Sequence, residues 1–255
     1  MTVEAIAAEL LEAYRTREPV EQLTARYELT LEDAYAIQLA QVRTWTGDGA
    51  QIVGHKVGLT SAAMQQMLGI DQPDYGHLRD DMQHGDGDEI PADAFIAPRA
   101  EPEIAFALKE RLAGPDVSLA DAERAVGAVA PALELIDSRI RDWKIGLLDT
   151  IADNASSGAF VLGAQRPLDG LDLPGLRCEL SLNGTIAETG DGAAVLGNPL
   201  AAVAWLGNTL GERGIALEAG HVVLPGACTK AIPFSAGDTV EASFSGLGTV
   251  SPRFV

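Results

Sequence analysis

The fold is decided by one stretch, residues 97–106, which reads APRAEPEIAF. In an extended chain successive side chains point to opposite faces, so Glu101 and Glu103 share one face. Two like charges side by side repel one another unless something neutralises them. A divalent cation, which prefers oxygen ligands, neutralises them well. The stretch therefore predicts a strand that carries two metal ligands or, as the plainer alternative, a strand edge with two solvated glutamates.

A third carboxylate lies a short distance downstream. Glu134 interrupts the apolar run ALELI at residues 132–136. Charged side chains are rarely buried without a partner, so Glu134 faces either a cation or a Lys or Arg side chain. Three carboxylates completed by water suit Mg²⁺ or Mn²⁺ rather than zinc, because no His or Cys accompanies them.

A lysine stands in the glycine-flanked run GHKVGLTS at residues 54–61. Glycine on either side lets a backbone or a ligand come close. Lys56 either neutralises a substrate anion and moves protons, or lays its stem along a sheet edge with its ammonium in water. His55 points to the opposite face of the same strand, which indicates a structural role.

Three later segments are rich in polar residues and turn signals. They are DQPDYG at 71–76, TIADNASSG at 150–158 and LPGACTK at 224–230. Each supplies donors to a ligand or, as the alternative, only turns the chain and caps its backbone, as Asp153 and Asn154 would. The candidate side chains are Asp74 and Tyr75 in the first segment, Ser156 and Ser157 in the second, Thr229 and Lys230 in the third, and Thr60 and Ser61 after the lysine strand.

Around these segments the pattern is helical at the front and strand-like behind. Helical spacing of apolar residues predicts helices at 3–14 and, after a capping box at Thr30, at 31–45. Further helices are expected at 118–129 and from Asn198 to about 210. Short apolar runs predict strands at 51–57, 94–97, 101–108, 132–136, 159–162, 177–182, 221–224, 239–244 and 249–254, with a hairpin turn at 183–184. We predict an α+β fold with a mixed or antiparallel core: one domain, 1–255, with a helical region at 1–50 and a β-rich core at 51–255.

The composition excludes several classes of partner. Of 255 residues, 37 are acidic and 18 are Lys or Arg, which gives a formal charge of −19. Nucleic-acid binding needs clustered cations, and an anionic membrane surface repels such a chain. The start resembles no signal peptide and no run approaches a membrane span, so a soluble cytoplasmic protein is expected. Cys178 and Cys228 are expected to be reduced thiols.

In this order, the segments resemble one known family. GHKVGLTS, DQPDYG, PRAEPEIAF, LELIDSRIRDWKI, DTIADNASSGAFVLG, AVLGNPLAAVAWL and VLPGACTKA are together similar to the 2-hydroxypenta-2,4-dienoate hydratases. These form part of the hydratase and decarboxylase branch of the fumarylacetoacetate hydrolase superfamily. The resemblance covers nearly the whole chain, and the shared order is far more specific than any single segment.

The resemblance implies a fold and a site. The fold is a mixed β-roll with an N-terminal helical region. The site holds Mg²⁺ or Mn²⁺ on Glu101, Glu103 and Glu134, and places Lys56 and Asp74 in catalytic roles. Two positions depart from the family pattern. Pro102 stands where Ala or Val is expected, which suggests an edge strand because proline has no N–H for a ladder. Ala227 stands where Ser is expected, so that position receives no catalytic hydroxyl.

The activity implied by the resemblance is a hydro-lyase reaction. The enzyme would hydrate 2-hydroxypenta-2,4-dienoate, a small anionic 2-oxo or enol acid, to 4-hydroxy-2-oxopentanoate in the meta-cleavage degradation of aromatic compounds. The first alternative is decarboxylation of 2-oxohex-3-enedioate (4-oxalocrotonate). An alternative of another class is a non-catalytic subunit in a complex with a decarboxylase or a downstream aldolase. A homo-oligomer is expected by family, and charge compensation near the site is expected from Arg99, Arg139 or Lys230.

Overall fold

The computed structural model describes residues 2–61, 65 and 72–255. At its centre is β5 (Arg99–Leu108), the strand that begins in the APRAEPEIAF stretch. The main sheet runs in the order β2-β1-β10-β5-β6-β7-β3, with β11 paired to β5 outside this path. The bounds are β1 Ile52–Gly58, β2 Asp74–Arg79, β3 Gln83–Gly85, β6 Val126–Ile136, β7 Ser157–Leu162, β10 Val222–Leu224 and β11 Ile232–Pro233.

This sheet is mixed and curls into a roll. β1 pairs with β10, and β3 with β7, in parallel, and the remaining pairs along the path are antiparallel. Because β2 also contacts β7, the two sides of the sheet approach one another. The predicted mixed β-roll is confirmed, and its inward face is where strand side chains from opposite walls meet.

The interior of the roll is apolar at one end. A buried cluster fills it, made of Leu78, Met82, Ala105, Ala132, Phe160, Val222 and Leu224. For the members that lie in strands, the register puts the side chains on the same face as Lys56, Glu103 and Glu134. Burying them stabilises the roll by roughly 25 cal/mol per Å² of apolar surface removed from water. The polar site therefore rests against an apolar floor.

The outward face of the sheet carries the larger core. Val57, Ile104, Phe106, Leu133 and Val161 belong to it. A second sheet, in the order β13-β12-β8-β9, covers part of this face through contacts of β8 with β5 and of β12 and β13 with β6. Its bounds are β8 Arg177–Leu182, β9 Thr185–Asp191, β12 Val240–Phe244 and β13 Gly248–Val250, and β4 (Glu89–Ile90) and β14 (Arg253–Phe254) form a separate pair.

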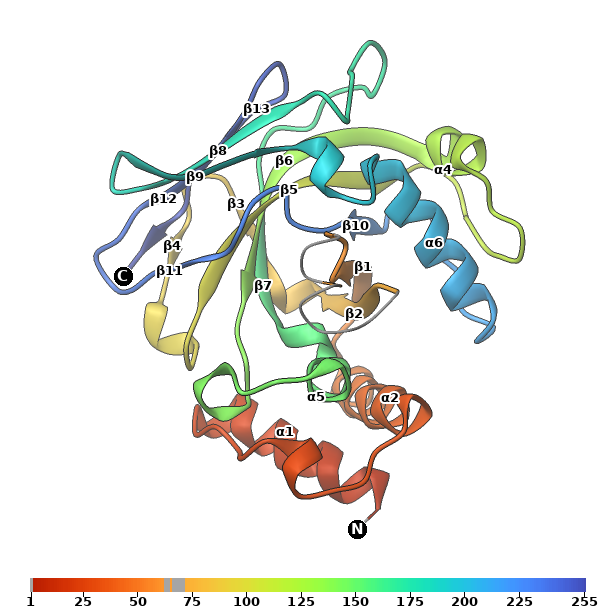
Figure 1. Ribbon diagram of the computed structural model, residues 1–255, viewed down its shortest axis with the longest axis vertical. Helices are drawn as coiled ribbons and strands as arrows, with labels where there is room; N and C mark the ends of the chain where they lie inside the picture. Colours follow the sequence, from red (N-terminus) through yellow and green to blue (C-terminus); the bar gives the residue numbers. More distant parts are fainter. Residues whose placement is uncertain (1, 62–64, 66–71) are drawn as a thin grey trace.

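Helices enclose the roll from two directions (Figure 1). α1 (Val3–Thr16) and α2 (Leu31–Gly47) lie together at one end, below α5 (Leu147–Ala152), while α4 (Leu119–Ala125) lies beside α6 (Pro199–Gly211). The capping box at Thr30 and Asp33 is present, and Asn198 accepts from the backbone of Leu200 ahead of Pro199. The predicted front helices and the 198–210 helix are thereby confirmed.

Several predicted elements are corrected by the structure. The helix expected at 118–129 ends at Ala125, because the chain turns into β6 at Val126 and joins the sheet. Residues 94–97 form no strand, since their amides bind the Asp137 carboxylate instead of a neighbouring strand. Residues 74–76 belong to β2 rather than to a turn, and residue 71 lies outside the described residues. The strand expected at 249–254 is divided into β13 and β14 around Pro252.

Pro102 is not in an edge strand, contrary to expectation. It lies in β5, which has β6 on one side and β10 and β11 on the other. β10 pairs with Phe106 and Ala107, and β11 pairs with Arg99 and Ala100. Pro102 stands in the gap between these two partners, where its carbonyl accepts from the Cys228 amide. A central strand tolerates proline here because the gap in the ladder falls beside it.

One described segment, Gly192–Gly211, is long and apolar enough to span a membrane, with 20 residues and a mean hydropathy of 1.2. Half of that window is buried inside the molecule, and only Pro199–Gly211 of it is α-helical. Its apolar side chains are used in the core. Cys178 and Cys228 are both free and buried, as expected.

Candidate active site and divalent-cation centre

Three carboxylates meet on the inward face of the central strands. Glu101 and Glu103 alternate along β5, and Glu134 lies directly opposite Glu101 in β6. One oxygen of each lies within 4.8 Å of the others. Like charges opposite one another in a ladder destabilise it, so this register favours the binding of a cation. The structure thus brings together the three residues that the sequence singles out as metal ligands.

The oxygens of this cluster are largely without protein donors. Glu103 and Glu134 are fully buried, whereas Glu101 is partly exposed. Glu103 Oε2 accepts from the Gly226 amide over 2.7 Å. Among the described residues, Glu103 Oε1 and both Glu134 oxygens have no hydrogen-bond partner. Buried polar atoms normally find partners, so these orphan oxygens fit a divalent cation, and hard oxygen donors suit Mg²⁺ or Mn²⁺.

The pKa values of the cluster reflect the same repulsion. Burial, followed by the charge of Glu134, raises the pKa of Glu101 to about 7. The same two causes raise the pKa of Glu103 well above its ordinary value, although the Gly226 amide opposes them. The free carboxylates thus resist full ionisation. A cation removes this penalty, because opposite charge favours the ionised form.

Lys56 reaches the cluster from β1. Its Nζ lies 3.4 Å from Glu134 Oε2 and donates to the Ala155 carbonyl over 2.9 Å. Burial alone would lower the pKa of this ammonium, but the charges of Glu134 and Asp74 outweigh it and raise the pKa. Lys56 is therefore a fixed cation beside the carboxylates. Its predicted place at the site is matched by the geometry, whereas the alternative of a solvated lysine at a sheet edge is not.

Asp74 is the residue of β2 that faces Lys56. The register pairs Asp74 with Gly58 and Lys56 with Gly76, so both side chains lie on the inward face. A Cβ at Gly58 would lie 2.2 Å from Asp74 Oδ1, which shows that the absence of a side chain there makes room for the carboxyl group. Burial raises the pKa of Asp74, while Lys56 opposes the shift.

A left-handed turn carries the carbonyl that Lys56 uses. Asn154, Ala155 and Ser156 have φ angles of 50°, 51° and 54°, a conformation that is rare outside glycine. The Asn154 side chain bonds both the amide and the carbonyl of His77 in β2, over 2.8 and 2.9 Å. These bonds tie the turn to the wall of the roll that carries Asp74.

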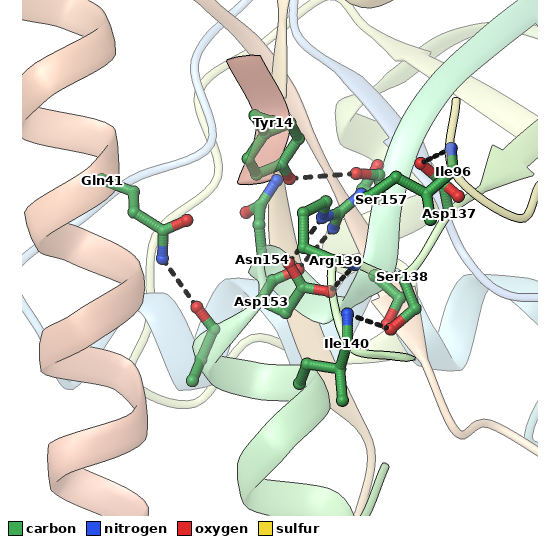
Figure 2. A network of polar contacts seen from close by, with 12 residues as sticks. Tyr14, Gln41, Ile96, Asp137, Ser138, Arg139, Ile140, Asp153, Asn154 and Ser157 are labelled. Atoms are coloured by element: carbon green, nitrogen blue, oxygen red, sulfur yellow. Dashed lines mark hydrogen bonds and ion pairs between the residues drawn. The ribbon is translucent and has the colours of Figure 1, made fainter. Parts of the chain in front are cut away.

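A buried ion pair braces the same turn (Figure 2). Arg139 donates to Asp153 Oδ1 over 2.6 Å and to the Asp153 carbonyl over 2.8 Å, while its amide donates to Asp153 Oδ2 over 2.9 Å. The Tyr14 ring lies 4.1 Å from the guanidinium carbon, and its hydroxyl donates to the Ser157 carbonyl. Arg139 was expected near the mouth of the site. It lies in the core instead, because Asp153 supplies the counter-charge there.

The sequence did not reveal this bracing role. Asp153 and Asn154 were interpreted as possible caps, and Asn154 does cap backbone groups, but those of a distant strand. The sequence shows only that Arg139 follows the apolar run of β6 and that Asp153 lies in a polar loop. They became informative only once the fold placed them together.

Of the other residues predicted to contact a ligand, some lie near the carboxylates and others point away from them. Thr60 is buried and packs against Gly226, the residue that binds Glu103. Tyr75 lies on the opposite face from Asp74 and stacks on Tyr35 at 4.7 Å, so it points away from the carboxylates. Lys230 is exposed.

The predicted serines and Thr229 make contacts of their own. The Ser156 hydroxyl lies 3.2 Å from that of Thr150. The Ser157 hydroxyl is buried without a described partner. The Thr229 hydroxyl donates to the Lys230 carbonyl. Ser61 is partly exposed.

Residues 51–255 match the family model described as fumarylacetoacetate (FAA) hydrolase C-terminal. The match spans the whole roll, including all five residues of the carboxylate, lysine and Asp74 site.

The chain belongs to the fumarylacetoacetate hydrolase family.

Within this family, the chain is similar along nearly its whole length to proteins that are named as hydratases. It is 45% identical to 2-hydroxyhexa-2,4-dienoate hydratase of Comamonas testosteroni, covering 99% of this chain and 97% of that one. It is 44% identical to 2-oxo-hept-4-ene-1,7-dioate hydratase of Escherichia coli, covering 98% and 97%. It is 41% identical to 2-keto-4-pentenoate hydratase of Paraburkholderia xenovorans, covering 98% and 94%.

A solved structure of the fumarylacetoacetate hydrolase fold matches equally well. The 4-oxalocrotonate decarboxylase of Pseudomonas putida, complexed with magnesium and adipate, superposes with a TM-score of 0.96 at 38% identity, covering 99% of this chain and 97% of that one.

Proposed function

We propose that this protein is a hydro-lyase that hydrates 2-hydroxypenta-2,4-dienoate to 4-hydroxy-2-oxopentanoate, in the meta-cleavage degradation of aromatic compounds. The observation that carries the proposal is the convergence of three carboxylates, Lys56 and Asp74 on one face of the roll. Relatives that are 40% to 45% identical over nearly the whole chain are named as hydratases of such acids. A chain that served only as a scaffold would gain nothing from burying five ionisable groups together.

Glu101, Glu103 and Glu134 would hold Mg²⁺ or Mn²⁺. Their orphan oxygens and their mutual repulsion fit such an ion. When bound, a divalent cation acts as a Lewis acid toward the carboxylate and the 2-oxygen of a 2-oxo acid and so favours its enolate form. The related decarboxylase structure contains magnesium. These three residues are therefore proposed as the ligand set.

Lys56 and Asp74 would manage charge and protons. Hydration requires a proton at C5 of the dienol, which gives a conjugated enone, then the oxygen of water at C4 and a proton at C3. Lys56 keeps its ammonium because of its carboxylate neighbours and would offset the negative charge of the substrate. Asp74, whose pKa is raised by burial, holds a proton more readily than an exposed aspartate and would exchange it with the substrate or with water.

Incubation of the protein with each of the two substrates distinguishes hydration from decarboxylation. The decarboxylase of similar structure makes the release of CO₂ from 2-oxohex-3-enedioate the second candidate activity. The purified protein with Mg²⁺ or Mn²⁺ should consume the ultraviolet absorbance of 2-hydroxypenta-2,4-dienoate and yield 4-hydroxy-2-oxopentanoate. Release of CO₂ from the dicarboxylate without hydration of the dienoate would reverse the assignment. Absence of both reactions would favour a non-catalytic subunit.

We further propose that the protein is a cytoplasmic homo-oligomer with one domain. The helical region is joined to the roll by the main hydrophobic core, in which Leu10 and Ile37 of the helices share a cluster with Val57 of β1. Light scattering after size exclusion would measure the number of subunits. A monomeric mass at micromolar concentration would contradict the proposal.

A further inference from the structure

Arg99 is the first residue of β5, the strand that also carries Glu101 and Glu103. It is on the same face of β5 as Glu101, two residues away, and it pairs with Ile136, whereas Glu101 pairs with Glu134. The apolar floor of the roll, with Ala105 and Ala132, lies in the opposite direction along the strands. Arg99 is also close enough to oppose the rise in the pKa of Glu101. It therefore stands on the side of the cluster away from the floor.

The guanidinium of Arg99 is held in place by an aromatic ring. Its central carbon lies 4.5 Å from the centroid of Trp143. Trp143 is itself fixed, because its indole Nε1 donates to the Ala97 carbonyl over 2.9 Å. Stacking on an indole orients a guanidinium while leaving its N–H donors free. The N–H groups of Arg99 are thus held in a fixed orientation, and the side chain is partly exposed to solvent.

In the described part of the chain this guanidinium acts on the charge of Glu101 but forms no ion pair within contact distance. Several other arginines form ion pairs: Arg26 with Glu9, Arg79 with Asp81, Arg111 with Glu218, Arg139 with Asp153 and Arg141 with Glu21. The two other cations expected to compensate charge are placed differently. Arg139 is committed in the core, and Lys230 is exposed on the loop before β11.

We propose that Arg99, oriented by Trp143, binds a second carboxylate at the far end of the substrate, so that the enzyme accepts dicarboxylic 2-oxo or dienoic acids as well as monocarboxylic ones. This inference rests on the proposed function, and extends its substrate class. The first carboxylate and the 2-oxygen are directed to the glutamate cluster, and the free fork of Arg99 matches the two oxygens of a carboxylate at the other end.

The test compares two acids of equal chain length by calorimetry on the Mg²⁺-loaded protein. Adipate has two carboxylates, and hexanoate has one. We expect the wild type to bind adipate roughly 10- to 100-fold more tightly, the worth of hydrogen bonds to a charged group. Arg99→Gln should abolish this preference and leave hexanoate affinity within about twofold of the wild type. Arg99→Lys should keep part of it, because the charge remains but the fork is lost.

The control variant is Arg111→Gln, which removes an arginine that pairs with Glu218 at an exposed position. It should keep the full preference for adipate. Equal affinity of the wild type for the two acids, or an Arg99→Gln variant that still prefers adipate, would overturn the inference. Turnover of 2-hydroxypenta-2,4-dienoate is measured in parallel. Its absence would refute the proposed function, whereas the adipate comparison reports on Arg99 alone.

Discussion

Arg139 and Asp153 form an ion pair whose side chains are 1% and 0% exposed. Their three hydrogen bonds fix the start of the left-handed turn that presents the Ala155 carbonyl to Lys56. A pair that is fully buried is costly to break from one side, because the remaining charge has no water to solvate it. The position of Lys56 is therefore coupled to a pair that does not touch the carboxylate cluster.

Asp153→Asn should destabilise the protein and slow the reaction. Loss of one charge leaves Arg139 buried and unpaired, at a cost of about 3–5 kcal/mol in the free energy of unfolding. In molecules that remain folded, kcat should fall on the order of 10- to 100-fold because the carbonyl that holds Lys56 shifts. Urea denaturation and steady-state kinetics measure the two effects. Glu21→Gln, which breaks the exposed pair with Arg141, should cost less than about 1 kcal/mol. Similar effects of the two variants would refute the bracing role.

Glu103→Gln should separate ion binding from folding. The amide keeps the shape of the side chain and an acceptor for Gly226, but removes a charge whose pKa is raised by burial and by its neighbours. Affinity for Mg²⁺ should fall on the order of tenfold or more, while the ion-free protein should become more stable to urea than the ion-free wild type. Glu241→Gln, at an exposed position of β12, should change neither. Unchanged Mg²⁺ affinity in calorimetry would exclude Glu103 as a ligand.

The pH dependence of stability should contain a contribution from His77. Burial lowers the pKa of this imidazole from 6.5 to about 4. Between these values the unfolded chain binds a proton and the folded protein does not, so stability falls as the pH drops from 6.5 toward 4. The loss should approach about 3 kcal/mol at the acidic end. His77→Gln should reduce the difference in stability between pH 6.5 and 4.5, as measured by urea denaturation at both pH values. An unchanged difference would contradict this contribution.

The close approach of β1 to β10 depends on Gly54. A Cβ there would lie 1.9 Å from the Val222 carbonyl oxygen, which belongs to the backbone and cannot rotate away. Gly54→Ala should therefore separate the strands and cost more than about 3 kcal/mol. Gly47→Ala is a matched control, because nothing lies within 4 Å of a Cβ at the end of α2. It should be neutral or stabilising by up to about 1 kcal/mol. Equal melting temperatures would contradict this account of the strand spacing.

The carboxylate set could be predicted from the sequence because strand periodicity is local. Alternation along β5 assigns Glu101 and Glu103 to one face, and an acid inside an apolar strand requires a partner. Long-range relations gave no comparable signal. The left-handed turn at Asn154–Ser156 contains no glycine, and only Asn154 belongs to a residue type that is enriched at positive φ, so three successive positive φ angles could not be predicted. From the sequence, Tyr75 is as good a candidate for the site as its neighbour Asp74. Both residues lie in β2, however, so their side chains point to opposite faces of the sheet.

The three glutamates come from one antiparallel pair, β5 and β6, whereas Lys56 and Asp74 come from another, β1 and β2. Under the proposed function, the ion would be bound by one wall of the roll and protons would be exchanged at the facing wall. Substitutions on the second wall would then alter which bond is made or broken without removing the ion's ligands. This division of labour gives a physical reason why one architecture accommodates hydratases and a decarboxylase among the relatives of this chain.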